Sequence, residues 1–440
     1  MDGGGGSRVT AAEEAPPRSW VAAWCTWDWG SAAFNAVMTT FVFTVYLTSS
    51  VGKDLPGPVS ATSWLSWSMA AAGFVVAVLA PVMGRRSDMA GNRKRSLGWW
   101  SLLVFLCTLG CFFVRDDYHY LWLGLILLAF GTVCYELSNV PYYAMLRQVS
   151  TPGTIGRVSG VGWACGYLGG IVLLLVCNFG FIAGDGGLLG LTTSDGLNIR
   201  LVAVLAALWF GLSALPVLLV LPREKPVAAP RLGIVGSYRD LFASIRELWR
   251  LDRNVVVFLV AQALFRDALA AVFTFGAVLG TTVYGMAAST VLIFGVVANV
   301  FAAAGAFVAG RFDDRYGPKP VIVVSLITMT VAGIALLLVS GEAMFWVFGL
   351  MLTIFVGPAQ SSARSFLTRL TPPGHEGQMF GLYQTTGRAA SFIAPTLFGA
   401  FIALFGADRA GIVGILIVLI AGLSVLLLVR PARDRALDAV

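Results

Sequence analysis

Charged side chains are scarce in this chain of 440 residues, where Asp, Glu, Lys and Arg together make up 12%. Soluble domains carry roughly a quarter charged residues, so most of this surface does not face water. Hydrophobic residues make up 58%, and the mean hydropathy is +0.81. The low charge content excludes an ordinary soluble protein and indicates a chain whose main partner is the lipid bilayer.

Histidine is scarcer still, and the two that occur, His119 and His375, are expected in loops on opposite sides of a membrane. A histidine-based catalytic triad or metal cluster is therefore not expected. The six cysteines lie inside apolar runs without the spacing of a zinc site. The glycine-rich segments lack the pattern of a nucleotide-binding loop. We expect no enzymatic activity, no cofactor and no metal.

Long apolar runs, in contrast, are abundant. Twelve of them reach about the 20 residues that a helix needs to cross a hydrocarbon core of about 30 Å. The alternating pattern of a membrane β-barrel is absent from the sequence. The sequence predicts an all-α membrane protein with twelve transmembrane helices, at residues 22–48, 60–84, 96–114, 121–146, 157–182, 199–221, 254–280, 286–310, 321–340, 343–368, 377–404 and 408–430.

Basic residues are distributed unevenly between the loops. The side that holds both termini carries 23 of the 30 Lys and Arg residues, the opposite side carries four, and three lie within spans. Because positive residues remain in the cytoplasm, both termini are predicted to be cytoplasmic. The net charge of +7 then reflects orientation, and we expect no nucleic-acid partner.

The longest non-apolar stretch, residues 222–253, divides the chain into halves. Within it, Tyr238–Arg253 combines one apolar face with four arginines, which is typical of an amphipathic helix on the inner leaflet, although a solvated linker helix fits nearly as well. No basic stretch precedes a short apolar core at the start, so we expect no removable signal peptide. The expected organisation is a disordered cytoplasmic tail at 1–19, six-helix bundles at 20–221 and 254–430, and a cytoplasmic tail at 431–440.

The two halves repeat one another in three places. One pair of loops begins with Gly, has Asp four residues later and Gly three after that, in Gly84–Lys94 and Gly310–Lys319. A second pair, Leu146–Gly160 and Leu367–Gly381, shares five of fifteen positions at a constant offset of 221 residues (367 minus 146). The third pair sets Asp28 and Phe34 against Asp267 and Phe273. Repeated six-helix halves are typical of secondary transporters, whose substrate site lies between them near the midplane.

The loop Gly84–Lys94 resembles the signature between helices two and three of the major facilitator superfamily, and Gly310–Lys319 resembles its second-half echo. The segments Asp28–Asn35 and Val140–Gly170 are similar to the unknown-major-facilitator family, which includes the autophagy-related vacuolar amino-acid effluxers. The resemblance implies two pseudo-symmetric six-helix bundles of the major facilitator fold. It also implies an amino acid or a related small polar solute as substrate.

The chain departs from these patterns in three places. Met89 stands where the superfamily signature usually has a basic residue after its Asp, and Tyr167 replaces the proline of an antiporter signature. A drug–proton antiporter is therefore less favoured. Arg266 stands where the family more often has a neutral polar residue, which leaves the substrate of this member open.

Asp88 and Asp314 are candidate gating residues. In a two-half transporter, each can approach the start of a helix in the other half, near Gly377 and Gly156 respectively. A carboxylate at a helix N-terminus gains about 0.3–1 kcal/mol. Such contacts would close the inner face, whereas the alternative is an ordinary turn. The gating set comprises Gly84, Asp88, Gly91, Arg93, Gly310, Asp314, Arg315 and Gly317.

Six charged residues fall inside the predicted spans. Each isolated charge at mid-bilayer costs about 2.5–3.5 kcal/mol on insertion scales, so each must face a cavity or a partner. By the resemblance, spans one, four, seven and ten line the central cavity, and four of the six charges lie there. These four are Asp28, Glu136, Asp267 and Arg364; Arg266 is the fifth, and Arg388 is expected to be structural.

Two interpretations of these charges remain open. In the first, a carboxylate takes up a proton or a sodium ion while Arg364 or Arg266 binds a substrate carboxylate. In the second, Arg266–Asp267 and Glu136–Arg364 are ion pairs that hold the halves together. For Asp28 the coupling role is favoured, because its span has no basic residue. Further polar candidates for the cavity are Asn35, Asn139 and Gln360.

These observations predict a secondary transporter that moves a small polar solute by alternating access, coupled to a proton or sodium ion. A sugar–cation symporter, a lipid or drug exporter and a transport-inactive membrane receptor are the alternatives. We expect a monomer embedded in the bacterial plasma membrane.

Overall fold

The computed structural model describes residues 15–222 and 253–430, and within these ranges the regular structure is entirely helical. Twelve helical segments there are long and apolar enough to cross a membrane. In the first half, span one consists of α1 (Arg18–Ala32), η1 (Ala33–Phe41), α2 (Phe43–Tyr46) and η2 (Leu47–Val51). The helices that follow in this half are α3 (Ala61–Ala90), α4 (Arg93–Gly110), α5 (Leu121–Ala144), α6 (Ile155–Cys177), the short α7 (Ala183–Gly186) and α8 (Leu197–Val220). The second half has α10 (Arg253–Thr282), α11 (Ala288–Tyr316), α12 (Pro318–Leu338), α13 (Glu342–Leu370), α14 (Glu376–Ala390), α15 (Ile393–Phe405) and α16 (Gly411–Leu428).

The predicted twelve spans are confirmed, with ends that differ by several residues. The helix of span one begins at Arg18, so the expected tail at 1–19 is too long by two residues. Three parts of the expected organisation lie outside the described residues. They are the N-terminal tail through residue 14, the linker at 223–252 and the C-terminal tail at 431–440. The expected amphipathic helix Tyr238–Arg253 falls in that linker, except for its last residue, which begins α10.

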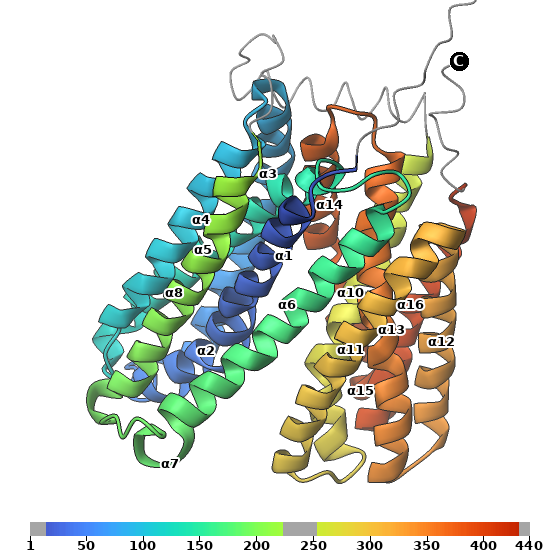
Figure 1. Ribbon diagram of the computed structural model, residues 1–440. Coiled ribbons are helices and arrows are strands. Elements are labelled where there is room, and N and C mark those ends of the chain that lie inside the picture. Colours follow the sequence, from blue (N-terminus) through green and yellow to red (C-terminus); the bar gives the residue numbers. More distant parts are fainter. Residues whose placement is uncertain (1–14, 223–252, 431–440) are drawn as a thin grey trace, which may run out of the picture.

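The spans form two bundles that lie side by side, α1 to α8 in one and α10 to α16 in the other (Figure 1). The contacts between them are pseudo-symmetric, because α6 of the first half packs along α11 while α14 of the second half packs along α3. The start of α1 and the end of α16 lie at the same end of the molecule (Figure 1). We call this the closed end; α3 and α11 finish there, and α6 and α14 begin there.

The segments Gly84–Lys94 and Gly310–Lys319 are mostly helical, so their assignment as loops is wrong. α3 and α11 both continue through their aspartates, because nothing before the terminal glycine stops the helix. The chain then turns at a single glycine in left-handed backbone, Gly91 (φ 56°) and Gly317 (φ 87°), which has no Cβ to clash. The two aspartates therefore project from helix ends, which are more rigid than loops.

Two lysines tie the third span of each half to its sixth. Lys94 on α4 donates to the carbonyl oxygen of Leu221 just past α8. Lys319 on α12 donates to the carbonyl oxygens of Leu427 (3.0 Å) and Val429 at the end of α16. Each cation thus lies at the negative end of a helix dipole. Sequence reasoning assigns both lysines only to membrane orientation.

Close packing within the second half depends on glycine. A Cβ built on Gly305 of α11 would lie 1.9 Å from the carbonyl oxygen of Ile354 on α13. From the facing helix, a Cβ on Gly357 would lie 2.2 Å from the carbonyl oxygen of Ala302. The two helices can therefore touch backbone to backbone only while both positions lack a side chain.

We predict that Gly305→Ala destabilises the protein by about 1–3 kcal/mol, because the added methyl group overpacks this contact. Gly295→Ala, also on α11, is the matched control, since a Cβ there meets no atom within 4 Å beyond the backbone of its own helix. The melting temperatures of the two purified variants in detergent test the prediction. Equal melting temperatures would contradict the close approach of α11 to α13.

Candidate functional site

Asp88 joins the two halves at the closed end. Its carboxylate accepts hydrogen bonds from the backbone N–H groups of Gly377 (2.9 Å) and Gln378 (2.8 Å) at the start of α14. A Cβ on Gly84 would lie 1.9 Å from the carbonyl oxygen of Gly377, so this glycine allows the helices to approach. The predicted contact between Asp88 and the helix start near Gly377 is confirmed.

Asp314 makes the pseudo-symmetric contact from the second half. Its carboxylate accepts hydrogen bonds from the backbone N–H groups of Gly156 (2.8 Å) and Arg157 (3.2 Å) at the start of α6. A Cβ on Gly310 would lie 2.8 Å from the carbonyl oxygen of Gly156. Each half therefore places a carboxylate at the positive end of a helix dipole in the other half, as the sequence predicts.

Further charges surround Asp88. Arg93 donates to Asp88 (2.6 Å) and to Glu376 (2.6 Å), and all three side chains are less than a tenth exposed. Arg147, just past α5, has its Nη1 3.3 Å from Glu376 and donates to two carbonyl oxygens at the end of α13. Arg93 and Arg147 of the first half thus hold Glu376 of the second.

A parallel network surrounds Asp314. The Nη2 of Arg369 lies 3.3 Å from Asp313 and 3.5 Å from Asp314, and its Nη1 donates to the carbonyl oxygen of Pro152 in the other half. Asp313 also accepts a hydrogen bond from the hydroxyl of Ser365. Arg315 of the gating set takes no part in this network as far as the described contacts go, and stacks over Tyr316.

Sequence reasoning misses four residues of these networks. They are Arg147, Asp313, Arg369 and Glu376. A signal was available, because two of them adjoin the predicted contact residues Asp314 and Gly377, and the two arginines lie in or beside the repeated segments. The gating role itself stays a prediction, since one conformation does not test it.

A second contact between the halves lies within the spans, on the side of the closed end. Arg364 on α13 donates from Nη1 to Asp28 on α1 (3.2 Å). Its Nε and Nη2 donate to the hydroxyl (3.0 Å) and the carbonyl oxygen (2.8 Å) of Ser159 on α6. The Arg364 side chain is 1% exposed. Removing one partner of such a buried pair costs about 3–5 kcal/mol, because the other charge is then uncompensated.

Aromatic rings enclose the Arg364 guanidinium, an arrangement that the sequence does not reveal. Cation–π contacts of this kind are worth about 2 kcal/mol or more where water is excluded. Gly162 on α6 leaves the space, since a Cβ there would lie 2.6 Å from the Trp24 ring and 2.9 Å from Asp28. The ring centroids lie 4.7 Å (Trp24), 5.0 Å (Trp163), 5.1 Å (Tyr143) and 5.9 Å (Tyr142) from the guanidinium carbon.

A separate polar cluster surrounds Glu136 on α5. One carboxylate oxygen of Glu136 accepts from Arg388, and the other accepts from the amide nitrogen of Gln384 (2.7 Å), both on α14. The amide oxygen of Gln384 in turn accepts from Nη1 of Arg266 on α10 (2.6 Å). The Arg266 guanidinium also lies 5.1 Å from the ring of Tyr383. The Glu136 carboxylate therefore accepts hydrogen bonds from Arg388 and from Gln384, and Gln384 links it to Arg266.

Asp267 lies apart from both clusters and caps a helix. Its carboxylate accepts a hydrogen bond from the backbone N–H of Ala394 (2.7 Å) in the first turn of α15. Span eleven is interrupted between α14 and α15, at residues 391–392. Pro395 explains the interruption, because its ring would clash with the carbonyl of residue 391 in a continuous helix. A coupling role for Asp267 is untested, and the geometry assigns it a capping role.

The two ion pairs considered from the sequence are not those in the structure. Glu136 pairs with Arg388 rather than Arg364, and Arg364 pairs with Asp28. Between Arg266 and its neighbour Asp267 the described contacts include no ion pair, because successive residues point about 100° apart on a helix. The charges of spans one, four, seven and ten thus form separate groups and not one cluster.

The three amide candidates occupy different environments. Asn139 is buried and its side-chain nitrogen donates to the carbonyl oxygen of Tyr135 one turn earlier. Asn35 is exposed, in the π-helical part of span one. Gln360 is partly exposed on α13, one turn from Arg364. Asn139 therefore bonds to its own helix, whereas the described contacts include no hydrogen bond of the Asn35 or Gln360 side chain.

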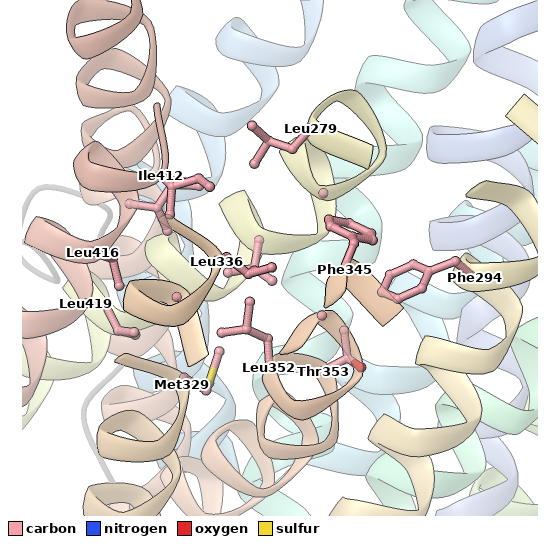
Figure 2. Close-up of a pocket in the computed structure, with 15 residues that line it drawn as sticks. Leu279, Phe294, Met329, Leu336, Phe345, Leu352, Thr353, Ile412, Leu416 and Leu419 are labelled. Atoms are coloured by element: carbon pink, nitrogen blue, oxygen red, sulfur yellow. The ribbon is translucent and has the colours of Figure 1, made fainter. Parts of the chain in front are cut away.

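An apolar cavity lies elsewhere, inside the second half. Figure 2 shows Leu279, Phe345, Leu416 and other apolar side chains around it, and Thr353 is the one polar side chain among its lining residues. None of the site residues predicted from the sequence lines it. Among the described residues there is also no group of three or more His, Cys, Asp or Glu side chains that could hold a metal ion.

Comparisons with known proteins agree with this architecture. A model of the family described as "Vacuole effluxer Atg22 like" matches residues 148–436. The Bacillus subtilis protein named "Uncharacterized MFS-type transporter YxiO" is 23% identical over 406 residues, which cover 92% of this chain and 93% of that protein. Autophagy-related protein 22-1 of Aspergillus fumigatus is 24% identical over 305 residues, and the match spans 63% of this chain but about half, 49%, of the fungal protein.

The fold is shared with solved transporters. The proton:xylose symporter XylE, a major facilitator superfamily protein, superimposes with a TM-score of 0.74 at 11% sequence identity, covering 95% of this chain and 96% of that one. At that identity the similarity establishes the fold alone. The predicted major facilitator fold is thereby confirmed.

We predict that Asp88→Asn weakens the closed end, because one carboxylate oxygen becomes a donor facing the N–H groups of α14 and Arg93 loses one of its two carboxylate partners, keeping only Glu376. Spin labels at the exposed positions Asn92 and His375 flank this contact from opposite halves. Double electron–electron resonance between them should show a new population at longer distance. Asp117→Asn, at an exposed carboxylate far from the closed end, is the matched control. An unchanged distance distribution in Asp88→Asn would contradict the gating role.

Proposed function

The chain belongs to the Atg22-like family of major facilitator transporters, and from this premise we propose that it is a secondary active transporter of small polar solutes, coupled to a proton or sodium ion. The protein is an integral, multi-pass membrane protein and a non-enzymatic transporter. We propose the bacterial plasma membrane as its location. The observation that carries the coupling proposal is the buried Asp28–Arg364 pair, which joins the two halves inside the spans.

The conformation supports alternating access. The contacts described above that join the halves extend from about the middle of the spans, at Glu136 and Arg388, to the closed end, at Asp88 and Asp314. That end holds the helix ends on the side with 23 of the 30 basic residues, which is predicted to be cytoplasmic. On this orientation the conformation is the outward-facing state, in which the inner face is shut.

Asp28 is the proposed coupling residue. As a carboxylate it holds Arg364, and through Arg364 it holds the second half against α1 and α6. Neutralising Asp28 with a proton, or screening it with a sodium ion, removes the charge that Arg364 needs in this position. The halves can then separate at the closed end. The affinity of the cation for one state over the other supplies the free energy for the change.

The proposed substrate class is an amino acid or a related small polar solute. Membership of the Atg22-like family supports it, as do the guanidinium groups and the amide that meet between the halves at Glu136. Uptake by liposomes containing the purified protein, with amino acids, sugars and peptides and with or without a proton or sodium gradient, tests the proposal. Gradient-dependent uptake of an amino acid is the expected result. Uptake of sugars alone would favour a sugar–cation symporter, and no flux of any solute would remove the transport proposal.

We predict that Asp28→Asn retains exchange of substrate but loses uphill uptake, since the variant keeps the shape of the side chain and cannot bind the coupling ion. The measurement compares counterflow with gradient-driven accumulation in the same liposomes. Asp117→Asn is expected to show both activities at the wild-type level. Full uphill uptake by Asp28→Asn would exclude this residue from coupling.

A further inference from the structure

We propose that Arg266 binds the carboxylate of the transported solute. This inference rests on the proposed function and identifies the chemical group that the site recognises. The sequence leaves two arginines, Arg364 and Arg266, as candidates for that role.

Arg364 is not available to a solute in this conformation. Its side chain is 1% exposed, and each of its three guanidinium nitrogens donates to Asp28 or Ser159. Aromatic rings fill the remaining space around it. A solute carboxylate would first have to displace Asp28, so Arg364 serves the contact between the halves.

Arg266 differs from Arg364 in both respects. It is partly exposed although it lies in the middle of a membrane span, and its described hydrogen bond is to a neutral amide, that of Gln384. Among the residues that the structure describes, no carboxylate forms an ion pair with it. Asp267, its neighbour, is committed to the first turn of α15. A guanidinium fork with free donors is the side chain best suited to a planar carboxylate.

The charge balance of the cluster points to an anion. Arg266 and Arg388 contribute two positive charges, and Glu136 contributes one negative charge, which leaves one positive charge uncompensated. An uncompensated charge in the membrane interior is unfavourable, so an anion that reaches the partly exposed Arg266 is stabilised there. Glu136 is already shared by Arg388 and Gln384, which leaves the positive charge on the Arg266 side of the cluster.

Aromatic rings connect this site to the coupling pair. The Arg266 guanidinium stacks on Tyr383, whose ring lies 6.5 Å from that of Tyr143, and Tyr143 in turn packs on Arg364. Arg266 and Tyr383 belong to the second half, and Tyr143 to the first. A carboxylate on Arg266 therefore lies beside the surface on which the halves move, where binding can bias that movement.

The test measures how strongly matched solutes raise the melting temperature of the full chain in lipid nanodiscs. The probes are L-alanine against L-alaninamide and lactate against lactamide, with chloride and phosphate as inorganic anions. We expect the carboxylates to act at concentrations at least about tenfold below those of the amides, since a hydrogen bond to a charged group is lost in each amide. Protection by chloride or phosphate alone, or no protection by either carboxylate, would overturn the proposal.

Two variants locate the effect. Arg266→Gln removes the guanidinium, and Gln384→Glu keeps it but places a carboxylate of this chain against it. Both should abolish the preference for carboxylate over amide, whereas Arg266→Lys should keep part of it. Arg409→Gln is the matched control, because Arg409 also stacks on a tyrosine, Tyr284, but lies elsewhere in the second half.

The melting temperature of each variant without solute shows whether it is folded. If Arg266→Gln is unstable, the near-isosteric Gln384→Glu still tests whether the carboxylate preference depends on Arg266. A carboxylate preference that survives in a folded Gln384→Glu protein would overturn the assignment. Binding without any flux in liposomes would instead remove the proposed transport and leave the carboxylate site standing, so the two failures are distinguishable.

Discussion

A charge buried in a membrane span must find a partner, and in this protein the partners lie across the boundary between the two halves. Asp28 of the first half holds Arg364 of the second, and Glu136 of the first holds Arg388. Because neither charge is stable alone in the membrane interior, each pair favours the conformation in which the halves meet. The same constraint makes the pairs sensitive to any cation or anion that reaches them. In the proposed mechanism, stability and transport therefore depend on the same few charges.

The closed end applies a weaker form of this interaction twice. Asp88 and Asp314 neutralise the N-terminal dipoles of α14 and α6, and each such contact contributes only about 0.3–1 kcal/mol. Their modest size is suited to a gate, since contacts of this size can break and re-form. The glycines at Gly84 and Gly310 bring the backbones close enough for these bonds to exist. The two contacts are related by the internal repeat, so the proposed gate has equivalent contacts in both halves.

The repeated sequence made part of this arrangement predictable. The partners of Asp88 and Asp314 follow from one rule, applied to two equivalent segments: a carboxylate is stabilised next to the N-terminus of a helix. The partner of Glu136 does not follow from sequence, because it depends on how far α13 and α14 are rotated toward α5. The capping role of Asp267 requires knowing that span eleven is interrupted, and Pro395 is the signal that sequence reasoning overlooks. The aromatic enclosure of Arg364 has no signal in spacing, since its rings come from α1, α5 and α6.

The central claim is that the Asp28–Arg364 pair joins the halves, and a double-mutant cycle tests it most directly. The cycle compares wild type, Asp28→Asn, Arg364→Gln and the double variant by the fraction of molecules whose closed end is shut. If the pair acts as a unit, the double variant loses no more than the worse single variant, with a coupling free energy of about 0.5–3 kcal/mol. Strictly additive losses would contradict the account, because they would mean that each residue acts without the other.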